Sequence, residues 1–290
     1  MAAPPAVESP LRVVLIGATG RMGRALLREA AALPRLAVTG AIAPVKSASL
    51  GRDSGELAGA ARLGVRVSGD LGRALADCDV ALDFSHPAAT RAHLLACRAA
   101  RKPLLVGTTG YPAALEEDFA AAAREIALLV APNTSLAVTV LVELVRIAAG
   151  SLPAGFDIDI LDVHHRTKRD APSGTALTLA AAAREARPAP HGAGGGGSGA
   201  GTATGSAGVP AAVSGARAEG EIGFAAVRAG DIVGEHTVLF SGPGEELSLN
   251  HRARDRGIFA RGALAAALWL QSRPPGRYAM RDVVLSKTIT

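Results

Sequence analysis

The sequence has 290 residues, of which 49% are hydrophobic and 20% are charged. This composition is typical of a soluble globular protein with one large domain or two ordinary ones, and it excludes a disordered chain. The net charge is +5, but aromatic residues make up only 3% and the arginines are scattered, so we expect no nucleic-acid partner.

The N-terminal sequence MAAPPAVESP lacks the basic and apolar regions of a secretory signal. Apolar runs such as 126–130 and 263–270 are shorter than the ~20 residues that cross a bilayer. We therefore expect a cytoplasmic protein with no membrane partner. Cys78 and Cys97 are the only cysteines, and they lie in neither a CxxC pair nor a metal-ligand spacing, so we expect no disulfide and no metal site.

The first predicted element is a buried strand at 11–16, which is followed by a glycine-rich turn and a helix. The turn reads GATGRMG, so its glycines have the spacing GxxGxxG. Gly17 permits a sharp turn, Gly20 lets backbone N–H groups approach a pyrophosphate, and Gly23 lets the helix pack closely on the strand. The phosphates would then lie at the positive end of the helix. This arrangement predicts a dinucleotide-binding site.

The residues after the second predicted strand, 36–42, bear on the choice of cofactor. NAD sites commonly carry a carboxylate there, which accepts hydrogen bonds from the ribose hydroxyls. Here no carboxylate occurs before Asp53, and Lys46 lies near the expected place of a ribose 2′-phosphate. We therefore expect NADPH as the preferred cofactor, with NADH possible. The alternative is that Lys46 is an ordinary surface lysine.

Three further apolar strands are each followed directly by small or hydroxyl residues: 80–84, 104–106 and 127–130. Helices at 89–101 and 115–125 would connect them. In a doubly wound parallel sheet, ligands bind beyond the carboxyl ends of the strands, so we expect these loops to line one crevice. His86 is interpreted as a helix cap and not as a catalyst.

The pattern changes after a predicted apolar helix at 136–149. The segment 156–163 alternates apolar and acidic residues with period two, which predicts a half-exposed antiparallel strand and a second domain. Gly230 and Gly234 separate further alternating residues within 222–240, where we expect a hairpin or meander.

The run HHRTKRDAPSGTA at 164–176 leaves that strand and leads into another predicted helix. The free N–H groups of Ser173-Gly174-Thr175 would bind a carboxylate at the start of the helix. Lys168 adds a positive charge, and His164 and His165 are expected to supply groups that can exchange a proton. Such a cluster suits reduction of a C=N or C=C bond in an acidic substrate, because a histidine or lysine proton would quench the charge that hydride transfer leaves.

The same run resembles the signature of the 4-hydroxy-tetrahydrodipicolinate reductase (dihydrodipicolinate reductase) family of bacterial lysine biosynthesis. The resemblance extends over nearly the whole chain, in the expected order. It includes GATGRMGR at 17–24, DFSHP at 83–87, GTTGY at 107–111, APNTS at 131–135 and IGFAAVRAGDIVGEHTVLF at 222–240.

This resemblance implies an α/β protein with an N-terminal Rossmann domain, a doubly wound parallel sheet, and a second α+β domain with an open mixed sheet. We expect the dinucleotide-binding domain at 1–133, completed by 257–290. The substrate-binding and tetramerisation domain would be 134–256, with a flexible Gly/Ala-rich loop at 188–216. The implied assembly is a homotetramer, and the implied partner is a small cyclic dicarboxylate.

The resemblance also implies roles for individual residues. His164 matches the proton donor, and Lys168 matches a second proton-donating or charge-stabilising residue. The residues that match substrate carboxylate contacts are His165, Gly174 and Thr175. The residues that match cofactor contacts are Gly17, Ala18, Thr19, Gly20, Arg21, Met22, Gly107, Thr108, Thr109, Ala131, Pro132, Asn133 and Thr134.

The implied reaction is the NAD(P)H-dependent reduction of 4-hydroxy-tetrahydrodipicolinate, or its dehydrated form, to tetrahydrodipicolinate in the diaminopimelate and lysine pathway. Two alternatives are an NADPH-binding regulator and another Rossmann reductase of an acidic imine. The intact pair of His164 and Lys168 disfavours the first, and the run at 164–176 disfavours the second. The missing acidic residue puts NADH use in doubt, and His86 replaces an arginine that some relatives carry near the adenosine phosphate.

Overall fold

The computed structural model describes residues 9–187 and 220–286. Among them, the residues within Met1–Leu136 and Arg256–Thr290 form one compact unit, and those within Ala137–Asp255 form a second. Each unit is described by itself below. The loop predicted at 188–216 lies outside the described residues.

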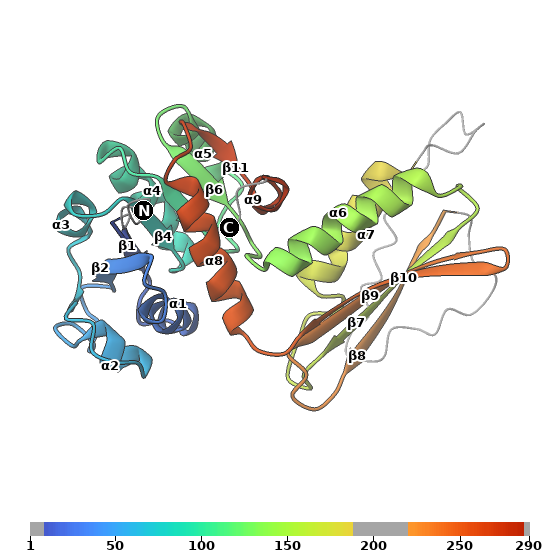
Figure 1. Cartoon of the computed structure of the whole chain (residues 1–290), viewed down its shortest axis with the longest axis horizontal. Helices are drawn as coiled ribbons and strands as arrows, with labels where there is room; N and C mark the ends of the chain where they lie inside the picture. Colours follow the sequence, from blue (N-terminus) through green and yellow to red (C-terminus); the bar gives the residue numbers. More distant parts are fainter. Residues whose placement is uncertain (1–8, 188–219, 287–290) are drawn as a thin grey trace, which may run out of the picture. The chain divides into compact units, whose positions relative to one another are not determined.

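The first unit is built on a seven-stranded sheet with the order β11-β6-β5-β4-β1-β2-β3 (Figure 1). All neighbouring strands are parallel. The order reverses between β1 and β4, which makes that place the topological switch point of the sheet. The strands are β1 (Leu11–Ile16), β2 (Leu36–Ile42), β3 (Val67–Ser68), β4 (Val80–Asp83), β5 (Leu104–Val106), β6 (Ala127–Val130) and β11 (Gly276–Tyr278).

Helices cover both faces of this sheet, because successive residues of its buried strands point to opposite sides. Val13 and Leu15 of β1 pack in one apolar cluster, whereas Val14 and Ile16 pack in another. The first cluster includes residues of α1 (Arg21–Ala31), α2 (Ser54–Ala58), α8 (Gly257–Leu270) and α9 (Met280–Leu285). The second includes residues of α3 (Leu71–Ala76), α4 (Pro87–Ala99) and α5 (Leu115–Ala123). The predicted doubly wound sheet is therefore confirmed.

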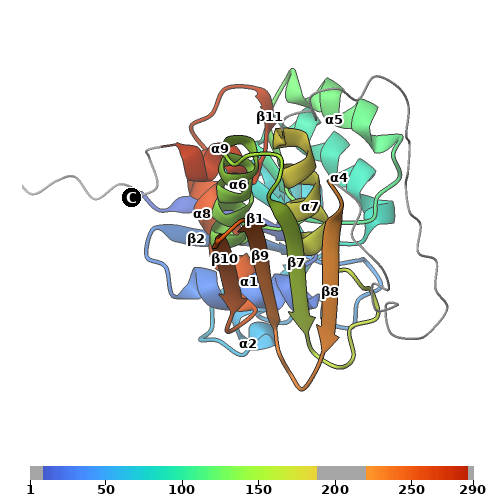
Figure 2. The same ribbon diagram turned by 90° about the vertical axis from the view of Figure 1, so that its right-hand side faces the viewer.

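The second unit is a four-stranded mixed sheet with two helices on one face (Figure 2). Its order is β10-β9-β7-β8, and the central strand β7 pairs parallel with β8 and antiparallel with β9. Its strands are β7 (Asp157–His164), β8 (Ile222–Arg228), β9 (Gly234–Gly242) and β10 (Glu245–Ala253), and its helices are α6 (Leu136–Ser151) and α7 (Gly174–Ala186). The predicted open mixed sheet is confirmed.

The hairpin predicted within 222–240 is wrong. β8 and β9 are not neighbours, because β7 lies between them and pairs with both. Glycines at 230 and 234 mark where strands end, but they carry no information on which strand each one pairs with. The hairpin of this sheet instead joins β9 to β10, and Gly244 in its turn has a φ of +79° that favours glycine.

Both cysteines are buried and free, as expected for small apolar residues of packed elements. Burial raises the pKa of Cys78 to about 11 and that of Cys97 well above its ordinary value. Both thiols are therefore protonated near neutral pH and unreactive as nucleophiles. No helix in the described part of the chain is long and apolar enough to cross a membrane.

Candidate active site

The glycine turn after β1 leads into a helix whose first turn is uncapped. Gly17 has a φ of +85°, and a Cβ there would lie 2.4 Å from the carbonyl oxygen of Phe84, just after β4. A Cβ at Gly23 would lie 2.2 Å from the carbonyl oxygen of Gly17. Gly20 caps α1 without a side-chain hydrogen bond, so N–H groups of its first turn remain for an anion. This is the local geometry that a bound pyrophosphate requires.

A buried carboxylate joins the loops that follow β4 and β5. Oδ1 of Asp83 accepts from the backbone N–H of Ser85 at 3.0 Å and from Oγ1 of Thr108 at 3.3 Å. Oδ2 of Asp83 lies 3.0 Å from Nδ1 of His93. Asp83 and His93 were not predicted as site residues, although the DFSHP motif contains the first of them. They hold Thr108 next to the loop that Gly17 contacts.

Two predicted cofactor residues after β6 use their side chains to bond their own loop and α8. Oδ1 of Asn133 accepts from the backbone N–H of Ser135 at 2.9 Å, and Oγ1 of Thr134 donates to the carbonyl oxygen of Phe259 at 2.7 Å. A Cβ at Gly262 of α8 would lie 1.8 Å from the carbonyl oxygen of Thr134. The loop after β6 therefore packs tightly against α8, and the side-chain contacts of Asn133 and Thr134 fix the conformation of the loop.

Lys46 and Asp53, which both follow β2, differ in burial. Lys46 is exposed in a turn, whereas Asp53 is buried and caps α2. The Asp53 carboxylate accepts from the backbone N–H groups of Gly55, Glu56, Leu63 and Gly64. Burial alone would raise its pKa, but these four donors hold the pKa below its ordinary value. Its hydrogen-bonding capacity is thus used within the protein.

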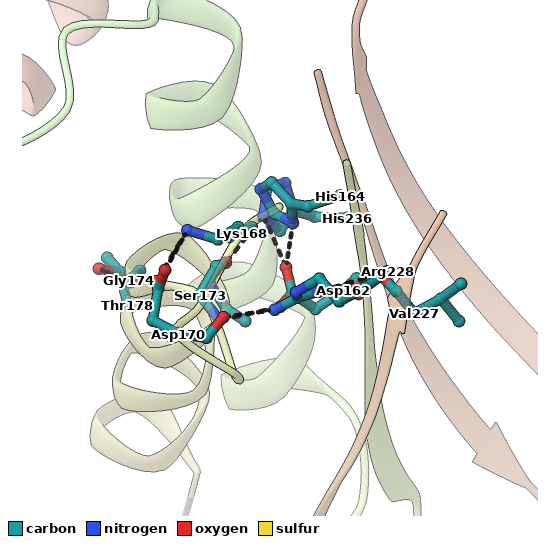
Figure 3. A network of polar contacts seen from close by, with 11 residues as sticks. Asp162, His164, Lys168, Asp170, Ser173, Gly174, Thr178, Val227, Arg228 and His236 are labelled. Atoms are coloured by element: carbon teal, nitrogen blue, oxygen red, sulfur yellow. Dashed lines mark hydrogen bonds and ion pairs between the residues drawn. The ribbon is translucent and has the colours of Figure 1, made fainter. Parts of the chain in front are cut away.

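The run 164–176 connects the end of β7 to the start of α7 (Figure 3). His164 is the last residue of β7 and is buried, whereas His165 is half-buried with its Nδ1 2.8 Å from Oγ1 of Thr167. Nζ of Lys168 donates to both carboxylate oxygens of Asp170, at 2.8 and 2.7 Å. Gly174 and Thr175 form the first turn of α7, where N–H groups favour an anion.

Asp162 lies at the centre of this cluster, although it was not predicted as a site residue. Its Oδ2 accepts from the backbone N–H of Ser173 at 2.8 Å and from Nη2 of Arg228 at 2.9 Å. Its Oδ1 lies 2.9 Å from Nδ1 of His164 and 3.4 Å from Nε2 of His236 (Figure 3). The period-two pattern of β7 could have identified it, because Asp162 shares the buried face of the strand with His164.

The electrostatics of the cluster place an ionised carboxylate beside a neutral imidazole at neutral pH. Burial lowers the pKa of His164 to about 4, although the Asp162 charge acts in the opposite direction. Burial would raise the pKa of Asp162, but the nearby donor groups of His236, Arg228 and Ser173 hold that pKa far below its ordinary value. An imidazole, an ammonium group and the first turn of α7 can together bind an anion and move a proton.

Asp162, His164 and His236 each offer one ligand atom, and these atoms lie within 4.8 Å of one another. Such a group could hold a metal ion. However, Arg228 already binds the same carboxylate at 2.9 Å, and its positive charge would repel a divalent cation in this buried place. We therefore interpret the group as a hydrogen-bonding network, and the absence of a metal stays a prediction.

The low pKa of His164 predicts a specific loss of stability in acid. Between pH 6.5 and about 4 the unfolded chain takes up a proton at this position that the folded chain does not, so the free energy of unfolding falls as the pH falls. From about pH 7.5 to about pH 5.5 the expected loss is about 1.3 kcal/mol. Urea unfolding followed by circular dichroism would measure it. His164→Gln cannot take up this proton, so an equal loss in that variant would contradict the assignment.

Comparison with known proteins matches both units to one family. Residues 11–134 match the family described as "Dihydrodipicolinate reductase, N-terminus", and residues 137–284 match "Dihydrodipicolinate reductase, C-terminus". Curated relatives from Anaeromyxobacter dehalogenans and Methylocella silvestris are each 44% identical over 274 residues, which cover 94% of this chain and 97% of each relative. Both relatives are named 4-hydroxy-tetrahydrodipicolinate reductase.

Solved structures share the fold. A dipicolinate-bound dihydrodipicolinate reductase from Paenisporosarcina sp. TG-14 aligns with a TM-score of 0.75 at 23% identity, over 94% of this chain and 99% of that one. An amine dehydrogenase from Mycobacterium smegmatis aligns with a TM-score of 0.58 at 15% identity, over 94% and 96% of the two chains. At these identities the structural likeness shows the fold alone, whereas the sequence matches span nearly the whole chain. This chain belongs to the dihydrodipicolinate reductase family.

Proposed function

We propose that this chain reduces 4-hydroxy-tetrahydrodipicolinate, or its dehydrated form, to tetrahydrodipicolinate in lysine biosynthesis, with NAD(P)H as reductant. The observation that carries the proposal is the cluster of His164, Lys168 and the start of α7 in a chain that matches reductases of this name over 94% of its length. An NADPH-binding regulator would need the glycine turn but not this cluster.

Substrate binding is assigned to the segment between β7 and α7. Gly174 and Thr175 lie in the first turn of α7, whose positive end would attract one carboxylate of a cyclic dicarboxylate. His165 is half-buried beside Thr167 and would contact the same carboxylate. Lys168 now pairs with Asp170, and a substrate carboxylate would compete for its ammonium group. The charges of the segment therefore suit a doubly anionic ring.

The residues of the cluster can also supply the proton that the reaction consumes. A reduced nicotinamide, when bound, supplies a hydride to the unsaturated ring, and the residues proposed to hold it are those of the glycine turn and the loops after β5 and β6. The second hydrogen arrives as a proton from His164 or Lys168. His164 is neutral in the free protein, so it must first take up a proton, which the two carboxylates of the substrate would favour.

The direct test follows the absorbance of NADPH with enzymatically generated 4-hydroxy-tetrahydrodipicolinate as substrate. Loss of absorbance that depends on both the chain and the substrate would support the proposal. Binding of NADPH without turnover would instead favour the regulator. Turnover of a different acidic imine, with none of this substrate, would favour another Rossmann reductase.

NADPH is proposed as the preferred reductant. Lys46 is exposed just beyond β2, and the first carboxylate after that strand, Asp53, is occupied by four backbone donors. We expect a higher kcat/KM with NADPH than with NADH. Lys46→Ala should lower kcat/KM for NADPH roughly tenfold, as expected for one charged hydrogen bond to a phosphate. The value for NADH should not change and serves as the control; a wild-type preference for NADH would refute this assignment.

A homotetramer acting in the cytoplasm is also proposed. The sheet of the second unit has one face packed on α6 and α7, and no described helix packs on the other. That other face carries the half-buried Leu161 and Val163 of β7 and the exposed Val227 of β8. A second copy of the sheet would cover these apolar side chains. Sedimentation velocity should then give a mass near four times 29.2 kDa.

A further inference from the structure

The carboxylate of Asp162 lies beside the ring of His164. Their Oδ1 and Nδ1 atoms lie 2.9 Å apart, and both atoms are buried. Within the described residues, neither atom has a hydrogen bond of good geometry. Two buried polar atoms left in this state are costly unless they bond to one another, which a small rotation of the ring would achieve. Catalytic hydrogen bonds are often poorly aligned before substrate binds.

The other oxygen of Asp162 is already fixed from two sides. Oδ2 accepts from the backbone N–H of Ser173 and from Nη2 of Arg228. Arg228 also donates to the carbonyl oxygens of Asp162 and Asp170, at 3.0 and 2.7 Å, which ties β8 to the Lys168 loop. The carboxylate therefore cannot turn freely, and only Oδ1 is left to face an imidazole.

The Nε2 edge of the His164 ring lies close to position 234. A Cβ at position 234 would lie 3.0 Å from Nε2 of His164, but this position is a glycine. With Nδ1 directed at Asp162, Nε2 is the nitrogen that remains for a ligand. The tautomer of His164 is thus determined by which nitrogen the carboxylate faces.

Charged and titratable groups of β7, β8, β9 and the loop before α7 act on His164. Arg228 on β8, His236 on β9 and Lys168 in the loop all disfavour a proton on His164. His251 on β10 stacks on His236, and the pKa of His251 is itself lowered by burial. Asp162 acts in the opposite direction. The imidazolium form of His164 therefore depends on the Asp162 carboxylate for its stabilisation.

We propose that Asp162 is a positioning residue, which holds His164 with its proton on Nδ1, directs Nε2 to the substrate and stabilises the imidazolium that donates the Nε2 proton. The inference rests on the proposed function, in which His164 is a proton donor. When the ring gives its Nε2 proton to the reduced substrate, it returns to the neutral Nδ1–H form, and solvent restores the donated proton. In this pair, His164 is the general acid and Asp162 holds it in the correct orientation.

The tautomer can be measured in the wild-type protein. In protein labelled with ¹⁵N-histidine, the seven histidines give separate ring signals, and His164 is identified by the signal that disappears in His164→Gln. We expect the neutral His164 ring to carry its proton on Nδ1. A proton on Nε2 in the free protein would overturn the proposal, and this result does not depend on how an Asp162 variant folds.

Kinetics of Asp162→Asn separate positioning from a structural role. We expect kcat to fall by at least about 10²-fold, while the KM for substrate and the affinity for NADPH change by less than about threefold. Loss of the carboxylate lowers the pKa of His164, so the alkaline limb of the kcat profile should move to lower pH by about one unit or more. Asp162→Glu keeps the charge and should return this limb close to its wild-type position.

Asp157→Asn is the matched control, because it removes the same charge at the exposed start of the same strand and should leave the profile unchanged. A folded Asp162→Asn variant in which neither the alkaline limb of the kcat profile nor the tautomer of His164 changes would refute the positioning role. If Asp162→Asn does not fold, the pH profile of Asp162→Glu and the tautomer of His164 in the wild-type protein still test the positioning role. Full activity in His164→Gln would refute the proposed role of His164, whereas activity lost there but kept in Asp162→Asn would refute only the positioning role.

Discussion

Lys168→Ala is expected to lower kcat by roughly 10²–10⁴-fold, the usual cost of removing a general acid or a charge that stabilises the transition state. Its ammonium group now pairs with Asp170, and the pair lies in the segment that would receive the substrate. The affinity for NADPH should stay within about twofold, since the proposed cofactor residues belong to the other unit. Initial rates and a fluorescence titration with NADPH measure the two effects.

Lys168→Arg distinguishes the two roles that remain open for this side chain. Arginine keeps the positive charge but does not give up a proton at neutral pH. Recovery of most of the lost turnover would favour charge stabilisation, whereas a loss as large as that of the alanine variant would favour proton donation. Normal turnover with weakened NADPH binding in Lys168→Ala would show that Lys168 belongs to the cofactor site and not to the substrate site.

Gly17→Ala is expected to weaken NADPH binding by at least about tenfold and to destabilise the first unit by roughly 2–3 kcal/mol. Two effects add at this position. The backbone has a φ of +85°, and the new Cβ would lie 2.4 Å from the carbonyl oxygen of Phe84. Either effect shifts the turn that leads into α1, where the phosphates are proposed to bind. Thermal unfolding followed by the fluorescence of Trp269, the single tryptophan, reports on this unit.

Gly59→Ala is the matched control for the backbone effect alone. Its φ is +74°, but a Cβ there would meet nothing within 4 Å. It should lower the stability by only about 1–2 kcal/mol and leave NADPH binding unchanged. Equal destabilisation by both variants would mean that the close approach to Phe84 has no energetic effect. Unchanged NADPH affinity in Gly17→Ala would refute the proposed phosphate site.

Local patterns predicted most elements of the fold. The apolar run of β1, its glycine turn and α1 are adjacent in sequence, so their signals are local and strong. The alternation in β7 likewise predicted a strand with one buried face. The predicted cap at His86 is confirmed, since its Nδ1 accepts from the backbone N–H of Ala88 at 3.3 Å. By contrast, the three-residue strand β11 is too short to produce a periodic signal.

The candidate site likewise contains residues that are adjacent in sequence and residues that only the fold brings together. His164, Lys168 and the start of α7 lie within one short run, so the sequence by itself determined which reactive groups lie together. The reaction proposed for them rests on the match to a family. The partners of Asp162 come from other strands: Arg228 is 66 positions away in the chain, and His236 approaches from β9. Period-two alternation places a residue on a face, but it does not state which strand lies alongside. Only the tertiary structure decided that β7 lies between β8 and β9, because strand order depends on long-range pairing and burial, and so only the structure shows a carboxylate facing the imidazole.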